Sequence, residues 1–326
     1  MIDMARVGVI GAGRAAAGRC RRIQETGRAR VAAVADPAEE ATDRLGAECG
    51  DQAPVAVYRD YAAMLAEETL DACLVASPPK LQEEHVTAAL EAGLHVLCER
   101  PMGCSAEGAR RLIAKAREQD RVLMAARPRH HEPAFRYMRA QLLQGAVGPV
   151  QFIHAIHCQD WLHMTRGTWR HDPELSGGGQ LLDAGNCFLE CASWAVNSRV
   201  ASVCARIERF DIPVDVNTAL SLTFANGALG SISIAGHAPA WHEDLAVIGG
   251  EGALHLRHGV GLIQHDARGA QIAPDLPRYD GCPASAFVQA ITGGDAPEPA
   301  LEWSVHALEV VEAALESAET GRHVEI

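Results

Sequence analysis

The stretch "VGVIGAGRAA", residues 7–16, decides the fold of the first half of the chain. Its β-branched run, Val7 to Ile10, leads into a glycine-rich turn, and the residues after the turn predict a helix that ends near Gly27. A second apolar run, Arg30 to Ala35, predicts the next strand. Strand, glycine turn, helix and strand in this order predict a βαβ unit of the kind that binds dinucleotides.

Each small residue of the glycine turn has an expected role. Gly11 allows the tight turn, Gly13 lets the backbone approach a pyrophosphate, and Ala16 permits close packing of the helix. The pyrophosphate is expected on the exposed N–H groups that begin the helix, at Arg14 and Ala15.

Asp36 ends the second predicted strand, 20 residues after Ala16. A carboxylate at this point can accept hydrogen bonds from both ribose hydroxyls and would repel a 2′-phosphate. The sequence therefore favours NAD over NADP as the cofactor. The alternative is a plain glycine turn with a surface aspartate.

The alternation of strands and helices continues beyond this unit. Further strands are expected at residues 72–76, 95–98 and 122–126, with helical stretches between them. Such an alternation predicts an α/β domain with a parallel, doubly wound sheet, in which ligands bind outside the carboxyl ends of the strands. Four residues follow those ends and are expected to face the cofactor: Ser77, Pro78, Glu99 and Arg100.

Composition restricts the partners and the compartment. The chain has 326 residues, is 48% hydrophobic and carries a formal charge of −13, so a small molecule is a better partner than nucleic acid or an anionic membrane. Its ten cysteines form no CxxC pair and suit reduced thiols in the cytoplasm; no metal site is expected. No export signal is recognised at the N-terminus, and the uncharged stretch 216–241 has the period of strands and not of a membrane helix.

The second half predicts mostly strands. A hairpin is expected to turn at Asn226 and Gly227, a second one follows in "LAVIGGEGALHLRH", and the tail forms an amphipathic helix that stops at Gly321.

Motifs along nearly the whole chain, in order "VGVIGAGRAA", "VADP", "DACLVASPP", "HVTAALEAGLHVLCERP", "GAVGPV", "TWR" and "SGGGQLLDAG", resemble the Gfo/Idh/MocA family of NAD(P)-dependent oxidoreductases. The resemblance implies a Rossmann domain, residues 1–125, and an α+β domain, residues 126–326, built on a large, open, mostly antiparallel sheet. It also implies a homo-oligomer, a dimer or tetramer, formed through one sheet face.

The resemblance also implies catalytic residues, and here the sequence departs from the family. The family's lysine in a Glu-Lys-Pro motif is Arg100, and the histidine of its Asp-x-Gly-x-His motif is Cys187, whereas Asp183 is retained. Arginine cannot pass a proton, but it can orient a nicotinamide or a substrate hydroxyl and stabilise an alkoxide.

Cys187 has two interpretations. It can take the substrate proton as a thiolate, which a helix N-terminus and the Arg100 cation would favour, or it can form a core stripe with Cys191 and Ala195. In the second case Asp183 is the best remaining base, with three histidines as possible substitutes: His130, His131 and His171.

Further residues are expected near the substrate. His130 follows the last Rossmann strand, and Trp169 with Arg170 matches the family's Trp-Arg pair, an apolar wall beside a fork of donors. Together with Asp183 these are the predicted substrate-binding residues. The glycines at 177–179 are expected either to let the backbone approach a ligand or to form a flexible turn.

Three functions follow from these residues. The first is an NAD-dependent dehydrogenase or reductase acting on a sugar, polyol or related compound. The second is a redox-neutral enzyme that returns the hydride to its substrate. The third is a nucleotide-binding regulator or partner subunit that has lost the chemistry.

Overall fold

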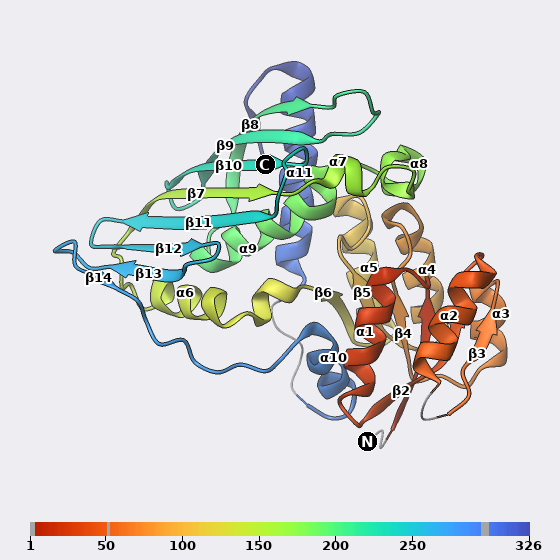
Figure 1. Ribbon diagram of the computed structural model, residues 1–326. Coiled ribbons are helices and arrows are strands. Elements are labelled where there is room, and N and C mark those ends of the chain that lie inside the picture. The colour runs from red at the N-terminus through yellow and green to blue at the C-terminus, as the bar shows by residue number, and fades with distance from the viewer. Residues whose placement is uncertain (1–3, 51–52, 295–299) are drawn as a thin grey trace. The chain divides into compact units, whose positions relative to one another are not determined.

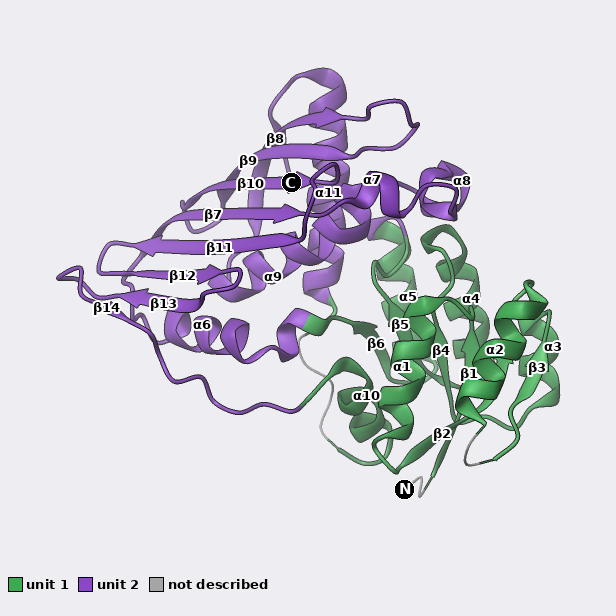
Figure 2. Cartoon of the chain, viewed as in Figure 1, with its two compact units in different colours: residues 1–103, 107–128, 281–301 green, residues 104–106, 129–280, 302–326 purple. Residues whose placement is uncertain are grey.

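The computed structural model describes residues 4–50, 53–294 and 300–326 (Figure 1). The prediction that the N-terminal segment is not an export signal includes residues 1–3, which lie outside the described residues. The chain forms two compact units (Figure 2). Unit 1 comprises Met1–Gly103, Glu107–Pro128 and Gly281–Leu301, and unit 2 comprises Cys104–Ala106, Arg129–Asp280 and Glu302–Ile326.

Unit 1 is built on a six-stranded sheet of order β3-β2-β1-β4-β5-β6 in which every neighbouring pair is parallel. The order reverses between β1 and β4, which creates the switch point where such sheets bind ligands. This confirms the predicted doubly wound sheet. Its strands are β1 (Ala5–Ile10), β2 (Ala29–Ala35), β3 (Ala56–Tyr58), β4 (Ala72–Val75), β5 (His95–Glu99) and β6 (Leu123–Ala126).

The helices of this unit cover the sheet with small and branched apolar side chains. They are α1 (Arg14–Gln24), α2 (Glu39–Cys49), α3 (Tyr61–Glu67), α4 (Pro79–Glu91), α5 (Ala106–Glu118) and α10 (Pro283–Ile291). One core cluster joins α1, α2 and α10 to the strands through Ala16, Ile23, Leu45 and Phe287. Helix α1 therefore packs between two helices that are far apart in sequence.

The sequence predicted one domain boundary, after residue 125, whereas each of the two units is made of three segments of the chain. The chain leaves unit 1 at Pro128 and returns to it over 281–301. The return occurs because α10 buries Phe287, Val288 and Ile291 in the core beside α1.

Unit 2 is built on a nine-stranded sheet of order β14-β13-β12-β11-β7-β10-β9-β8-β15. Only the β7–β10 pair is parallel among its described pairs, and both expected hairpins are present. The large, mostly antiparallel sheet is thus confirmed. Its strands are β7 (Val150–Cys158), β8 (Val200–Glu208), β9 (Asn217–Phe224), β10 (Leu229–Ala235), β11 (His242–Gly249), β12 (Ala253–Arg257), β13 (Gly261–His265), β14 (Gln271–Ile272) and β15 (Val324–Glu325).

Helices cover one face of this sheet. Along β9 the residues from Thr218 to Phe224 alternate between buried and more exposed positions, and among the neighbouring strands β8 contacts α11 and β7 contacts α9. The helical segments from β6 onward are η1 (Pro128–His131), α6 (Pro133–Leu143), α7 (Trp161–Met164), η2 (Trp169–His171), α8 (Pro173–Ser176), η3 (Leu181–Gly185), α9 (Asn186–Val196) and α11 (Glu302–Thr320). Segment η3 is a π-helix that runs directly into α9.

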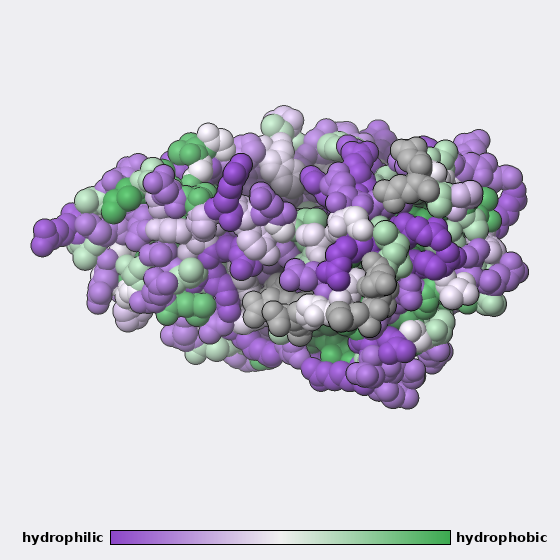
Figure 3. All heavy atoms as spheres, turned by 90° about the horizontal axis from the view of Figure 1, so that it is seen from below, coloured by the Kyte–Doolittle hydropathy of each residue, from purple (hydrophilic) through white to green (hydrophobic). Residues whose placement is uncertain are grey.

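Charged and polar residues predominate on the surface seen in Figure 3, where apolar side chains form small separate groups. Within the described ranges, none of the helices has both the length and the apolar character needed to cross a membrane.

Candidate active site

The glycine turn of unit 1 has the geometry that its sequence requires. Gly11 has a φ of +95°, and a Cβ there would lie 2.7 Å from the carbonyl carbon of Ala76. Its N–H donates to the carbonyl of Ala35 at 2.9 Å. Glycine is required here for two reasons: other residues rarely adopt this φ, and their Cβ would collide with the backbone that follows β4.

The start of α1 leaves room for an anion. The N-cap residue is Gly13, so no N-cap side chain accepts from the first N–H groups of α1, and a Cβ at Gly13 would have no protein atom within 4 Å. Gly13, Arg14 and Ala15 are exposed, whereas Ala16 is fully buried in the core. Helix N–H groups that face open space beside a tight turn fit a pyrophosphate.

Asp36 lies beside the glycine turn. Its Oδ2 accepts a hydrogen bond from the N–H of Ala12 at 2.8 Å, and its Oδ1 accepts one from the N–H of Ala38 at 2.9 Å. Each oxygen keeps a further lone pair, so the carboxylate is held in place and can still accept from ribose hydroxyls.

Gln82, which the sequence did not single out, joins the carboxyl ends of β4 and β5. Its amide nitrogen donates to the carbonyls of Ser77 and Glu99, each at 3.2 Å, and its oxygen accepts from the N–H of Gly103 at 2.8 Å. Gln82 is 1% exposed. A buried glutamine with all three bonds made is a structural clamp, and its position on α4 carried no motif that could have revealed it.

Glu99 and Arg100 have different surroundings. Glu99 is 9% exposed and forms an ion pair with Arg19 of α1 at 2.5 Å, so its carboxylate ties β5 to α1. Arg100 is partly exposed and is joined to Pro101 by a cis peptide bond. Pro78, also predicted, is the N-cap residue of α4.

In unit 2, Asp183 is the centre of a polar cluster. Its Oδ2 accepts hydrogen bonds from Nε1 of Trp161 and from Nε of Arg170, both at 2.8 Å. Asp183 lies in the π-helix η3, a geometry that often occurs at functional sites because it displaces a side chain from the regular helix. The predicted pair Arg170 and Asp183 is thus in contact, whereas Trp161 belongs to no recognised motif and was not predicted.

The residues around Arg170 extend this cluster. The guanidinium of Arg170 lies 4.3 Å from the centre of the Trp169 ring. His171 Nε2 lies 2.9 Å from the hydroxyl of Thr165, and its ring lies 5.3 Å from the ring of Trp161. Aromatic faces beside charged donors suit a hydroxylated substrate.

His130 and His131 lie elsewhere in unit 2. His130 is 1% exposed and its ring is 4.5 Å from that of Trp194 in α9. His131 is 6% exposed and stacks on Tyr279 at 6.0 Å. Of the three histidines that could substitute for the family's base, His171 contacts Trp161, which donates to Asp183.

Cys187 is 1% exposed, and Cys191 and Ala195 are fully buried. This burial favours the interpretation of the three as a core stripe. Nη1 of Arg129 donates to the thiol of Cys187 at 3.2 Å, and Arg129 also forms an ion pair with Glu243.

Asp215 organises the backbone before Asp183. Its carboxylate accepts from the N–H groups of Gly179 at 2.8 Å and Leu181 at 2.6 Å, and burial raises its pKa above the ordinary value. A Cβ at Gly179 would lie 1.9 Å from the carbonyl oxygen of Asp215. The close approach at this glycine is therefore to Asp215, which the sequence did not reveal as its partner.

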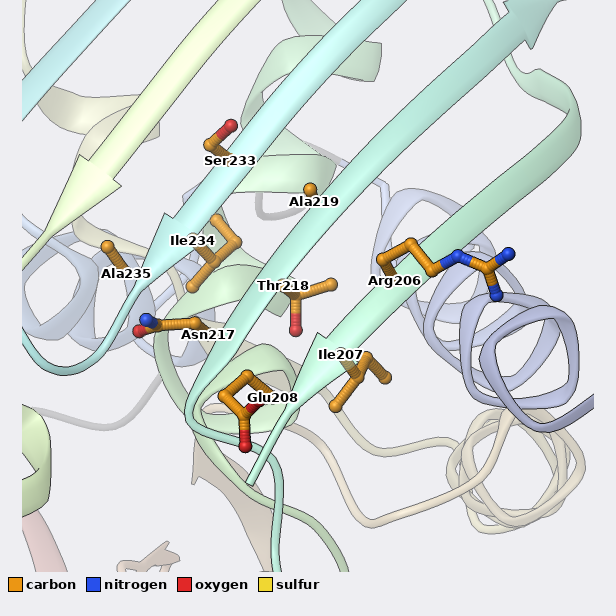
Figure 4. Close-up of a pocket in the computed structure, with 9 residues that line it drawn as sticks. All are labelled: Arg206, Ile207, Glu208, Asn217, Thr218, Ala219, Ser233, Ile234 and Ala235. Carbon is orange, nitrogen blue, oxygen red and sulfur yellow. The ribbon is translucent and has the colours of Figure 1, made fainter. Parts of the chain in front are cut away.

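A depression of about 420 Å³ lies on the sheet of unit 2 (Figure 4). Its lining residues come from three adjacent strands and include none of the predicted site residues: Arg206, Ile207, Glu208, Asn217, Thr218, Ala219, Ser233, Ile234 and Ala235. Small side chains such as Ala219 and Ser233 leave the strands accessible there.

Comparisons with known proteins place these features in context. Residues 5–127 match an oxidoreductase family with an NAD-binding Rossmann fold, and residues 135–255 match a GFO/IDH/MocA C-terminal domain. A dTDP-3,4-didehydro-2,6-dideoxy-α-D-glucose 3-reductase of Actinomadura kijaniata is 30% identical over 286 residues, which are 84% of this chain and 81% of that protein.

A D-xylose 1-dehydrogenase [NADP(+)] of Haloarcula marismortui is 30% identical over 208 residues, 61% of this chain and 57% of that protein. Against this and the inositol 2-dehydrogenase relatives, the chain spans about half of their length. Among solved structures, an oxidoreductase domain protein from Kribbella flavida superposes with a TM-score of 0.88 at 22% identity, covering 100% of both chains. This last likeness supports the fold.

Proposed function

The chain belongs to the Gfo/Idh/MocA family of oxidoreductases, and from that premise we propose that it is an NAD-dependent oxidoreductase acting on a sugar, a polyol or a related compound. A hydride would pass between the nicotinamide and a carbon that changes between hydroxyl and carbonyl. The observation that carries the proposal is the Asp183 carboxylate, held by Trp161 and Arg170 where a polar substrate can be oriented.

Unit 1 supplies the nucleotide contacts. The open N-terminus of α1 fits the pyrophosphate, and Asp36 fits the ribose of an NAD whose 2′-hydroxyl is free. When bound, the nicotinamide accepts or returns the hydride. Arg100, partly exposed at the end of β5, would orient the nicotinamide or stabilise the oxygen that changes charge.

Unit 2 supplies the substrate contacts. Trp169 and Arg170 would form a wall and a fork of donors for hydroxyl groups, while Asp183 would position the reacting hydroxyl. His130 and Cys187, both buried, would support the packing of α9 instead of touching the substrate.

The proposal is tested by single-turnover absorbance in the NADH band, with NAD-loaded protein in excess over each alcohol. The panel comprises D-xylose, inositol, levoglucosan and 1,5-anhydro sugars, chosen from the names of similar proteins. A band that rises and stays supports the dehydrogenase. If calorimetry shows that NAD binds but no compound of the panel produces NADH absorbance, the result would count against the dehydrogenase.

A redox-neutral reaction is the second candidate. It is favoured by the two changed groups, Arg100 and Cys187, because altered proton transfer is where a different outcome would arise. In this case the NADH band would rise and decay while product forms. A regulator without chemistry would bind NAD and give no band with any alcohol.

The homo-oligomer belongs to the same proposal. The open face of the nine-stranded sheet aligns Leu229, Phe152 and Ile248 in one row across β10, β7 and β11. Leu229 and Ile248 are 53% and 39% exposed, an apolar surface that a second copy would cover. An Ile248→Asp variant should shift the mass measured by light scattering towards the monomer, whereas Leu143→Asp on α6 should not.

The cytoplasm is the proposed location. All ten cysteines are free thiols, and most are buried in the two cores. Free thiols persist in a reducing compartment. Thiol titration of unfolded protein isolated from its native cells under alkylating conditions should give ten reduced cysteines.

A further inference from the structure

The proposed reaction needs a group that takes a proton from the substrate hydroxyl as the hydride leaves the carbon. The family's histidine is absent at position 187, and the cysteine there, in the first turn of α9, is 1% exposed. On Asp183, two N–H donors already occupy Oδ2. A separate proton acceptor in the Asp183 cluster would complete the site.

Thr165 fixes the tautomer of His171. The Thr165 hydroxyl lies 2.6 Å from the carbonyl oxygen of Trp161, which can only accept, so the single hydroxyl proton is directed there. Towards His171 Nε2, at 2.9 Å, the hydroxyl can then only accept. The proton of the neutral imidazole is therefore on Nε2, and Nδ1 carries the basic lone pair.

The same contacts place the ring in the cluster. His171 packs on the Trp161 ring at 5.3 Å, and Trp161 donates to Asp183. Its neighbour Arg170 donates to the same carboxylate oxygen. The imidazole is partly exposed, as a group that meets a substrate must be.

The ring is also neutral under ordinary conditions. Burial, and secondly the charge of Arg166, lower the pKa of His171 below its ordinary value. The charged groups of the cluster are Arg166, Arg170 and Asp183, and of these Arg166 acts against an imidazolium at His171. A neutral imidazole at pH 7 can accept a proton.

We propose that Nδ1 of His171 takes the substrate's hydroxyl proton, in place of the histidine that is absent at position 187. This inference rests on the proposed function. With NAD bound, the electron pair of the C–H bond would leave as hydride to the nicotinamide, the pair of the O–H bond would become the second carbonyl bond, and the proton would move to Nδ1 and then to water. In the reducing direction each transfer reverses.

The test uses His171→Gln, whose amide nitrogen can still donate to Thr165 but whose side chain cannot take a proton. With the alcohol that gives the fastest NADH signal in the panel, kcat should fall by roughly 10²–10⁴-fold. In wild type, kcat should decline on the acid side with a midpoint below about 6.5, and this limb should be absent from the variant. NAD affinity and the melting temperature should stay unchanged, and added imidazole should restore part of kcat.

Two controls complete the design. His163→Gln alters an exposed histidine of the neighbouring helix α7 and should leave kcat and its pH profile intact. Long-range ¹H–¹⁵N spectra of ¹⁵N-histidine protein report the tautomer of His171 without any turnover.

The outcomes separate the inference from the proposed function. A His171→Gln variant within threefold of wild-type kcat, with the same acid limb, overturns the assignment while the oxidoreductase stands. A spectrum with the proton on Nδ1 overturns it as well. If wild type produces no NADH from any alcohol, the proposed function fails and the role of His171 fails with it.

Discussion

The two units build their sites in different ways. In unit 1 the nucleotide cradle is made of backbone: a turn at Gly11, the free N–H groups of α1 and one carboxylate, Asp36, all within a short span of sequence. In unit 2 the cluster is made of side chains from separate segments, with Trp161 and Arg170 meeting on Asp183. The first kind of site depends on local conformation, and the second depends on tertiary packing.

This difference has a practical advantage for experiments. The five tryptophans are all in unit 2, at positions 161, 169, 194, 241 and 303. Tryptophan emission therefore follows the unfolding of unit 2, and the binding of NAD follows the integrity of unit 1.

The largest expected effect comes from glycines. Gly179→Ala in unit 2 places a Cβ 1.9 Å from the carbonyl oxygen of Asp215 and should cost about 3–5 kcal/mol of unfolding free energy, or prevent folding. Gly13→Ala in unit 1 meets open space at a φ of −73° and should change stability by less than about 0.5 kcal/mol. Urea unfolding followed by tryptophan emission and by circular dichroism measures both.

For Gly13→Ala the loss should appear in binding. The added methyl group occupies the space beside the first N–H groups of α1, so calorimetry should give weaker NAD binding with an unchanged melting temperature. Equal destabilisation by both alanines would remove the distinction between a cradle of backbone and a cluster of side chains.

The next effect is on turnover. Asp183→Asn keeps the shape but loses the charge that pairs with Arg170, and kcat should fall by roughly 10²–10⁴-fold. NAD affinity should be unchanged, since the nucleotide contacts proposed above are in unit 1. Asp160→Asn, which breaks an exposed pair with His163, is the matched control. Retained turnover in Asp183→Asn would contradict the role assigned to the cluster.

A smaller effect is expected from the carboxylate of unit 1. Asp36→Asn should weaken NAD binding by roughly 10–100-fold, because a hydrogen bond to a charged group is worth about 1.5–3 kcal/mol. It should weaken NADP binding less, since the repulsion of a 2′-phosphate disappears. The ratio of the two dissociation constants measures this, and an unchanged ratio would show that Asp36 does not select the cofactor.

The smallest effect concerns pH and unit 2. His306 is buried, its Nε2 accepts from the N–H of Val200 at 2.8 Å, and burial lowers its pKa. Between the lowered folded pKa and the unfolded value of about 6.5, the unfolded chain binds a proton that the folded chain does not. The contribution of His306 to the free energy of unfolding is therefore fully present above about pH 6.5 and is lost as the pH falls towards the lowered folded pKa.

In His306→Gln this slope should flatten by at most about 1.4 kcal/mol per pH unit. Urea midpoints by tryptophan emission at pH 5 to 8 measure it, with the exposed His323→Gln as the control. A slope identical to wild type would mean that another group titrates.

What could be predicted from the sequence follows the same division between local and tertiary features. The strands around Ile10 and Ala35 and the tight turn at Gly11 are encoded within one supersecondary unit, so the pattern and the structure agree there. The short β3 and α3 lack a strong period and were not predicted.

The substrate side depends on contacts between distant residues. Asp183 and Arg170 were found through a resemblance, but Trp161 and Asp215 contact the same segment from elsewhere in the chain and have no motif of their own. For Cys187, which is buried, the sequence left two interpretations open, a core residue and a proton acceptor. A spacing of four residues along a helix fits both.

The return of the chain to unit 1 has a consequence for its synthesis. Helix α10 completes the core around Ala16 and Ile23, yet it lies more than 150 residues after β6. At about 5–20 residues per second, a ribosome needs roughly 10–30 s to reach it. During that interval the part of α1 that packs on α10 stays uncovered, so the nascent nucleotide-binding half should be a transient client of chaperones that recognise exposed aliphatic surface.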